Sequence, residues 1–219
     1  MLTTKKIAYA LLHPRYLMRR IIHAIVSPIR RATNYNPDQW GRVVMYRELF
    51  EYVGRLRPET LSVLELSPGE DGLHSPWRRI GFGRYESVDY PDFDICKDRL
   101  DREFDLIIAD QVFEHLLWPY RAARNVHSML KTGGRFVNTT PFLIPVHAAP
   151  VDCSRWTELG MKHLLAETGF ELEKITTGSW GNLACVRANL VHLPTAAGWR
   201  RRFINEPHLP VSVWAIAEK

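Results

Sequence analysis

Short apolar runs alternate along this chain with amphipathic stretches, and the two patterns have different periods. Runs rich in Leu, Ile and Val, such as 61–66 and 104–109, predict buried strands. The predicted strands cover residues 61–66, 85–89, 91–95, 104–109, 135–140, 170–176 and 211–217. Apolar residues at helical spacing predict helices over 38–56, 118–130 and 157–169, with Gly133 and Gly134 ending the second and Gly169 the third. This alternation predicts an α/β fold with a doubly wound sheet covered on both faces.

Residues 1–35 form a separate predicted unit, a basic amphipathic helical arm before a main domain over 36–219. Its apolar positions recur at helical spacing, while Pro14 and Pro28 interrupt the pattern. We consider three interpretations of the arm. It packs as a lid or an oligomer contact, it lies on an anionic membrane surface, or it contacts phosphate groups of a substrate or a nucleic acid.

The distribution of charge and of cysteines limits which partners and which cellular environment the chain can have. Residues 1–31 contain seven of the 29 basic residues and no acidic one, so the remainder of the chain is close to neutral and nucleic acid is a disfavoured partner of the main domain. The cysteines Cys96, Cys153 and Cys185 form no CxxC and no metal-ligand spacing, which predicts a reducing, cytoplasmic environment and no metal site. No apolar run approaches the ~20 residues that a membrane span needs.

The turn after the first predicted strand is the clearest candidate ligand site. The strand carries Glu65 near its end, and Ser67, Pro68 and Gly69 follow it. A glycine turn lets the backbone approach a ligand, and the carboxylate lies at the end of the strand. This arrangement suits a nucleoside, although Pro and Gly are also common in any strand-to-helix turn of an α/β protein.

Acidic residues also follow other predicted strands. Glu65, Asp89, Asp98 and Asp110 lie at or just past strand ends, and Thr140 ends a further strand. Ligands of doubly wound sheets bind outside the carboxyl ends of the strands. A mostly acidic wall disfavours a diphosphate cofactor. It suits a ligand with ribose hydroxyls, an amino group and a positively charged sulfur.

This order of elements resembles the class I S-adenosylmethionine-dependent methyltransferases over residues 40–219. The first-strand motif of that family reads hh[DE]hGxGxG, and Val63–Gly69 fits it with Ser67 in place of the first glycine. Residues 104–137 resemble the fourth strand, helix and fifth strand of the small-molecule branch, with LKTGG in place of LKPGG. The resemblance implies a Rossmann-like sheet of seven strands, mostly parallel, with an antiparallel last strand.

The same resemblance implies S-adenosyl-L-methionine as the cofactor. Glu65 and Gly69 would lie by its methionine and ribose part, Asp89 would take the ribose hydroxyls, and Asp94 or Asp98 would approach the adenine amine. The full set of cofactor-binding residues implied is Glu65, Ser67, Gly69, Asp89, Tyr90, Asp94, Asp98, Asp110 and Gln111. Residues 147–169 resemble a motif common among methyltransferases of sugar and polysaccharide biosynthesis.

Three residues are candidates for the chemistry of transfer to a hydroxyl. A general base assists such a transfer, and His115 and His147 have the appropriate residue type, with Asp152 as the partner that orients His147. Arg155 is a candidate for binding an anionic group of the acceptor, and Trp156 for stacking on a sugar. The alternative is structural: His115 orders its loop, His147, Asp152 and Arg155 brace theirs, and Trp156 packs.

The predicted function is therefore methyl transfer from S-adenosyl-L-methionine to a small molecule or saccharide, at a hydroxyl. One alternative is a non-catalytic protein of the same fold that binds a nucleoside or a partner protein. Another is a nucleic-acid or protein methyltransferase docked through the basic arm, although the N-methylation signature [DNS]PP[YFW] is absent. A nicotinamide dehydrogenase is disfavoured because no GxGxxG follows the first strand.

Overall fold

The computed structural model describes residues 40–68, 75–148, 151–191 and 204–219. The longer helices are α3 (Trp40–Gly54), α4 (Pro119–Ser128), α5 (Glu158–Glu167) and α6 (Leu183–Val191). The strands are β1 (Ser62–Leu66), β2 (Arg84–Val88), β3 (Phe104–Asp110), β4 (Leu130–Pro141), β5 (Ile175–Trp180) and β6 (Ser212–Glu218). Single 3-10 turns are η2 (Pro58–Thr60), η3 (Trp77–Ile80), η4 (Phe113–His115) and η5 (Leu172–Lys174).

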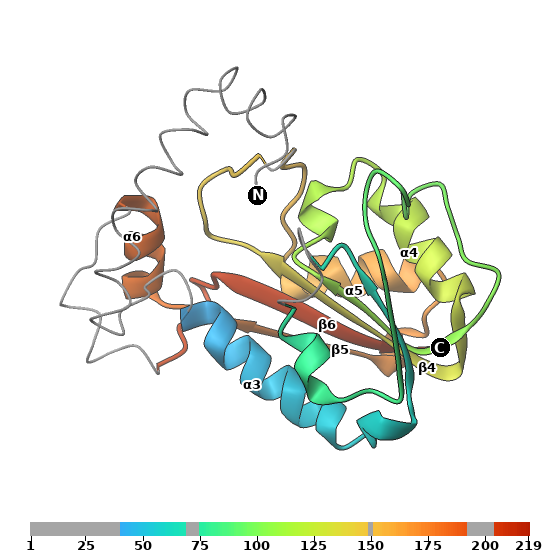
Figure 1. The fold of residues 1–219 in the computed structure, drawn as a ribbon. Coiled ribbons are helices and arrows are strands. Elements are labelled where there is room, and N and C mark those ends of the chain that lie inside the picture. The colour runs from blue at the N-terminus through green and yellow to red at the C-terminus, as the bar shows by residue number, and fades with distance from the viewer. Residues whose placement is uncertain (1–39, 69–74, 149–150, 192–203) are drawn as a thin grey trace, which may run out of the picture. The chain divides into compact units, whose positions relative to one another are not determined.

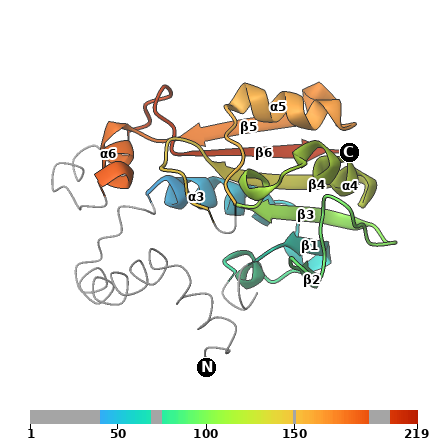
Figure 2. The same ribbon diagram turned by 90° about the horizontal axis from the view of Figure 1, so that it is seen from above.

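The strands form one mixed sheet in the order β2-β1-β3-β4-β6-β5, as Figure 2 shows. The four strands β2, β1, β3 and β4 are parallel, and β6 runs antiparallel between β4 and β5. The antiparallel last strand confirms the prediction from the sequence. Because β1, β2 and β3 are parallel and in register near their ends, their carboxyl ends meet at one edge of the sheet, which we call the carboxyl edge.

The prediction of a seventh strand is not confirmed, because residues 91–95 form turns in the described structure. Their backbone hydrogen bonds are local. The Phe93 N–H donates to the Asp89 carbonyl over 3.0 Å, and the Asp94 N–H donates to the Asp98 carboxylate over 2.7 Å. These donors are used within the turn, so they do not extend the sheet beyond β2.

Helices cover both faces of the sheet, as Figure 1 shows. On one face α4 and α5 bury Val126, Met161 and Leu165 against Ile107 and Ala109 of β3. On the other face α3 buries Met45, Leu49 and Val53, and α6 buries Cys185, in a cluster that contains Leu106 and Ile108 of β3. Successive residues of β3 therefore serve opposite faces, which explains its continuous apolar sequence.

Two element boundaries differ from the prediction. Gly133 and Gly134 were expected to end the helix before them, but α4 ends at Ser128 and both glycines lie within β4. Gly133 has a φ of 74°, and a Cβ on Gly134 would lie 2.8 Å from the Lys131 carbonyl oxygen. The glycines thus permit a close turn inside the strand. The strand expected over 170–176 begins later, at Ile175, because a 3-10 turn occupies Leu172–Lys174.

The predicted basic arm over residues 1–35 lies outside the described residues, and its role and boundary stay predictions. Within the described ranges, we find no helix with the length and apolar character that crossing a membrane requires.

Candidate functional site

Two non-glycine residues with left-handed backbone lie at the carboxyl edge of the sheet. Ser67 follows β1 with a φ of 48°, and Gln111 follows β3 with a φ of 59°. The Ser67 N–H donates to the Val88 carbonyl, and the Gln111 N–H donates to the Thr139 carbonyl, so hydrogen bonds to neighbouring strands hold both turns. Backbone held in this region clusters at functional sites. The position where the resemblance expects glycine therefore keeps a glycine-like conformation with serine.

Asp110, the last residue of β3, accepts hydrogen bonds from side chains of three separate elements. The Tyr46 hydroxyl donates to its Oδ2 over 2.6 Å, and the Trp77 indole N–H donates to the same oxygen over 2.9 Å. The Thr139 hydroxyl donates to Oδ1 over 2.6 Å. Burial and the Asp110 charge together raise the pKa of Tyr46, which keeps its phenol protonated as a donor. Asp110 thus joins α3, η3 and β4 at the carboxyl edge.

The carboxylate of Glu65 in β1 is buried and bound by protein donors. Glu65 is 2% exposed, and the Ser75 hydroxyl lies 2.7 and 2.8 Å from its two oxygens. The Tyr85 hydroxyl also donates to it. Burial raises the pKa of Glu65, while the Tyr85 and Ser75 hydrogen bonds oppose that shift. Its predicted contact with the methionine end of a cofactor stays a prediction.

The acid after β2 has a different environment. Asp89 is exposed, and Tyr90 beside it is 64% exposed. Asp94 accepts from the Cys96 N–H and pairs with Lys97, and Asp98 accepts from the Asp94 N–H, so these two acids stabilise their own turn. Gly69 lies outside the described residues. Of the predicted acids, Asp89 is therefore the one most open to a ligand.

The loop after β4 brings His147, Asp152 and Arg155 together as predicted. His147 Nδ1 lies 3.1 Å from Asp152 Oδ2, and the Arg155 guanidinium binds both oxygens of the same carboxylate. The Arg155 hydrogen bond holds the pKa of Asp152 well below its usual range. Burial lowers the pKa of His147, although Asp152 opposes that shift. The imidazole is thus neutral near pH 7 and is oriented by an ionised carboxylate.

Arg155 was predicted to bind an anionic group of the acceptor. Its guanidinium is already engaged by Asp152, with its side chain 22% exposed. This agrees with the structural alternative, in which Arg155 braces the loop.

His115 approaches His147 from η4. The two ring centroids are 5.1 Å apart, and His115 Nδ1 lies 2.5 Å from the Val151 carbonyl oxygen. Glu114, the residue before it, is fully buried, and burial raises its carboxyl pKa to about 8. Its backbone carbonyl accepts from the Cys153 N–H over 2.7 Å, which ties the loop to η4. Glu114, His115 and His147 each offer a ligand atom, and these atoms lie within 4.8 Å of one another.

That grouping was not anticipated from the sequence, which predicted no metal site and did not single out Glu114. Glu114 and His115 are adjacent in the chain, but His147 comes from a different loop, so no spacing motif connects the three. Tyr46 and Trp77 around Asp110 were likewise missed as site residues, because an aromatic residue on a helix face is more often part of a core.

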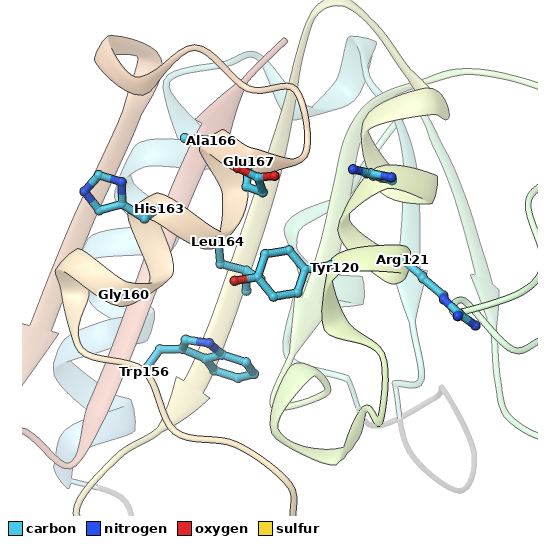
Figure 3. A pocket seen from close by; sticks show the side chains of 9 residues that line it. Tyr120, Arg121, Trp156, Gly160, His163, Leu164, Ala166 and Glu167 are labelled. Carbon is cyan, nitrogen blue, oxygen red and sulfur yellow. The ribbon is translucent and has the colours of Figure 1, made fainter.

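A cavity of about 940 Å³ lies between α4 and α5 (Figure 3). Tyr120, Arg121 and Arg124 line it from α4, and Trp156, His163 and Glu167 line it from the other side. Trp156 also packs against the apolar core. The cavity lies between the helices that cover one face of the sheet, and Trp156 is the predicted site residue that reaches it.

The sequence matches one family of proteins over most of the described domain. The family model described as "Methyltransferase domain" matches residues 40–175, which is more than half of the chain. This chain belongs to the methyltransferase domain family. The matched range contains β1 to β4, and so it includes the carboxyl edge and the loops of His115 and His147. Among curated proteins, none matches the sequence significantly.

Solved methyltransferase structures have a similar fold. An S-adenosylmethionine-dependent methyltransferase from Archaeoglobus fulgidus is 15% identical with a TM-score of 0.51, over 79% of this chain and 94% of that one. Phosphoethanolamine N-methyltransferase 2 of Haemonchus contortus, in complex with S-adenosyl-L-methionine, is 12% identical with a TM-score of 0.52, over 80% of this chain and 52% of that one. At these identities the similarity shows the Rossmann-like methyltransferase fold.

Proposed function

We propose that this methyltransferase acts on a hydroxyl of a small-molecule or saccharide acceptor. S-adenosyl-L-methionine is the methyl donor, which the family match supports. When bound, it supplies an electrophilic methyl group on a sulfonium. The observation that carries the choice of a hydroxyl is the His147–Asp152 pair, a neutral imidazole oriented by a carboxylate.

The side chains at the carboxyl edge fit such a donor. Asp89 presents an exposed carboxylate, which is a suitable acceptor for the two vicinal hydroxyls of a ribose. The exposed ring of Tyr90 adjoins it. The turn at Ser67 gives the backbone the left-handed conformation that a close approach to a ligand requires. We assign Ser67, Asp89 and Tyr90 to the donor site on these grounds.

His147 is the residue that we assign as the general base. The Asp152 carboxylate can only accept, so His147 Nδ1 carries the proton and Nε2 holds a free lone pair. That lone pair can take the proton of an acceptor hydroxyl, a contribution typically worth about 10²–10⁴ in rate. Asp152 keeps the imidazole oriented and stabilises the imidazolium, and Arg155 keeps Asp152 ionised.

The choice of a saccharide rests on the exposed aromatic rings near the start of α4. Trp118 and Tyr120 are each 53% exposed, and the Arg121 guanidinium lies 4.7 Å from the centre of the Trp118 ring. Exposed aromatic faces favour stacking on sugar rings, and the arginine adds a hydrogen-bond donor for polar groups.

Labelled methyl transfer to a panel of sugar nucleotides and lipid-linked glycans tests this proposal. We expect turnover of at least one hydroxyl acceptor, with kcat/KM constant above pH 7 and falling at acidic pH. The fall follows from protonation of His147, whose pKa lies below the usual 6.5.

The variant His147→Gln, which lacks the base, should lose about 10²–10⁴ in kcat. His208→Gln, an exposed histidine in another turn, is the matched control and should keep its rate.

Two results would contradict the assignment. Equal rates for His147→Gln and the control would remove His147 as the base. Donor binding without turnover of any hydroxyl acceptor would favour the non-catalytic alternative.

A further inference from the structure

Glu114 is a buried carboxylate without a hydrogen-bond partner in the part of the chain that the structure describes. Its side chain is fully buried, and neither carboxylate oxygen has a donor from another residue there; its own backbone N–H opposes the rise of its pKa. Buried polar groups are normally paired, because desolvation without a partner is costly. The His115 Nε2 lies 3.6 Å from Glu114 Oε1. A buried acid without a partner beside two imidazoles is a candidate ligand, because a bound cation would displace the proton that burial favours.

The two imidazoles are already oriented as metal ligands usually are. His115 Nδ1 lies 2.5 Å from the Val151 carbonyl oxygen, which can only accept, so Nδ1 carries the proton. His147 Nδ1 is fixed in the same way by Asp152. Both Nε2 lone pairs are therefore free. A histidine that donates one ring N–H to a carbonyl or carboxylate and keeps the other nitrogen free has the usual arrangement around a bound metal.

We propose that Glu114, His115 and His147 form a binding site for one divalent transition-metal cation, with Zn²⁺ as the chemically best match. Two imidazole nitrogens and one carboxylate oxygen are the ligand set of open zinc sites, in which a further position is left for water or substrate. One possible ligand atom from each of the three side chains lies within 4.8 Å of the others. Zn²⁺ bonds of about 2.0–2.2 Å bring ligand atoms to roughly 3–4 Å apart, so the loop of His147 closes slightly on binding.

The surrounding charges are mixed. Arg155 lies close to the site but is neutralised by Asp152, with which it forms a two-point ion pair. Arg42 and Arg155 both act on the Glu114 carboxyl electrostatically, and Asp110 acts in the opposite sense. Among the described residues, Glu114 forms no ion pair with either arginine. The carboxylate therefore remains available to a cation.

Metal binding at this site does not depend on the proposed function, but its effect on the reaction rests on the proposed transfer to a hydroxyl. A hydroxyl that coordinates a cation at the open position loses its proton more readily. His147 would then act as a ligand and not as the base. The cation would lower the pKa of the coordinated hydroxyl, and the released proton would pass to solvent water. The preferred acceptor would be an oxygen that can coordinate a metal.

The test uses the full chain after chelator treatment, with its fold checked by circular dichroism. We expect one equivalent of Zn²⁺ to remain after desalting, measured by elemental analysis, and Co²⁺ to give the visible absorption of a low-coordinate nitrogen and oxygen site. His147→Ala, at a partly exposed position, should lower the affinity by more than about 100-fold. Asp152→Asn should lower it by about 10- to 100-fold, since it orients His147. Glu114→Gln keeps the shape of the side chain but cannot supply a carboxylate ligand, so it should also lower the affinity.

His208→Ala is the matched control and should bind like the native chain. The proposal is overturned if the chelated native protein takes up no Zn²⁺ or Co²⁺. It is also overturned if His147→Ala and Glu114→Gln both bind as tightly as the native chain, because the ion would then lie elsewhere. Calorimetry with S-adenosylhomocysteine on the metal-free protein separates this result from a failure of the proposed function.

Discussion

At the scale of single residues, the carboxyl edge depends on Asp110 more than the sequence suggests. The sequence places an acid at the end of a buried strand, and the structure shows that its oxygens are used by Tyr46, Trp77 and Thr139. Those donors come from three elements that are far apart in the chain. Such a junction depends on tertiary packing, so local pattern cannot reveal it. The same holds for Glu114, which the sequence did not single out.

Asp110→Asn is predicted to destabilise the protein by about 1–3 kcal/mol, because the amide NH2 group cannot accept and leaves at least one buried donor without a partner. Urea unfolding of the variant measures the loss. Asp101→Asn, at an exposed aspartate in the turn before β3, is the control and should change stability by less than about 0.5 kcal/mol. Equal stability of the two variants would mean that Asp110 does not join these elements.

At the scale of elements, the sequence predicted most strands and helices because their apolar residues recur at the spacing of a strand or of a helix. The strand β3 reads as continuously apolar because both of its faces are buried, and α5 carries its N-cap in the sequence, with the Thr157 hydroxyl accepting from the Gly160 N–H. The prediction was wrong where hydrogen bonds override the local pattern. Residues 91–95 satisfy donors inside a turn. Gly133 and Gly134, which suggested a helix end, instead lie within β4, where the Gly133 N–H donates to the Lys219 carbonyl and the Lys219 N–H donates to the Gly134 carbonyl.

The end of α5 shows what one glycine contributes to the packing of elements. Gly169 has a φ of 119°, and a Cβ there would lie 3.2 Å from the His127 ring of α4. Gly169→Ala is therefore predicted to cost about 1–3 kcal/mol through backbone strain, before any shift of His127.

Thermal or urea unfolding tests the prediction, with Gly54→Ala as the control. A Cβ on Gly54 would meet nothing within 4 Å, and the position lies at the end of a helix, so we expect no loss there. A stable Gly169→Ala variant would show that α4 and α5 tolerate a shift at this contact.

At the scale of the whole molecule, the sequence predicted a class I methyltransferase domain, and the family match and the mixed sheet support that class. The acceptor and the role of residues 1–35 stay predictions. A basic amphipathic pattern is compatible with several partners, and an acceptor is recognised by loops that vary within one fold. The pairing of His147 with Asp152 was predictable because both lie in one short loop.

We propose that the carboxyl edge of β1, β2 and β3 binds S-adenosyl-L-methionine, with Asp89 accepting from the ribose hydroxyls. Calorimetric titration of the full chain with S-adenosylhomocysteine tests this binding. We predict saturable binding to the native chain, an affinity about tenfold or more weaker for Asp89→Asn, and native affinity for Asp92→Asn, an exposed aspartate in the same turn. Absence of binding at millimolar ligand would exclude a donor site at this edge, and equal affinities for all three proteins would exclude Asp89 from it.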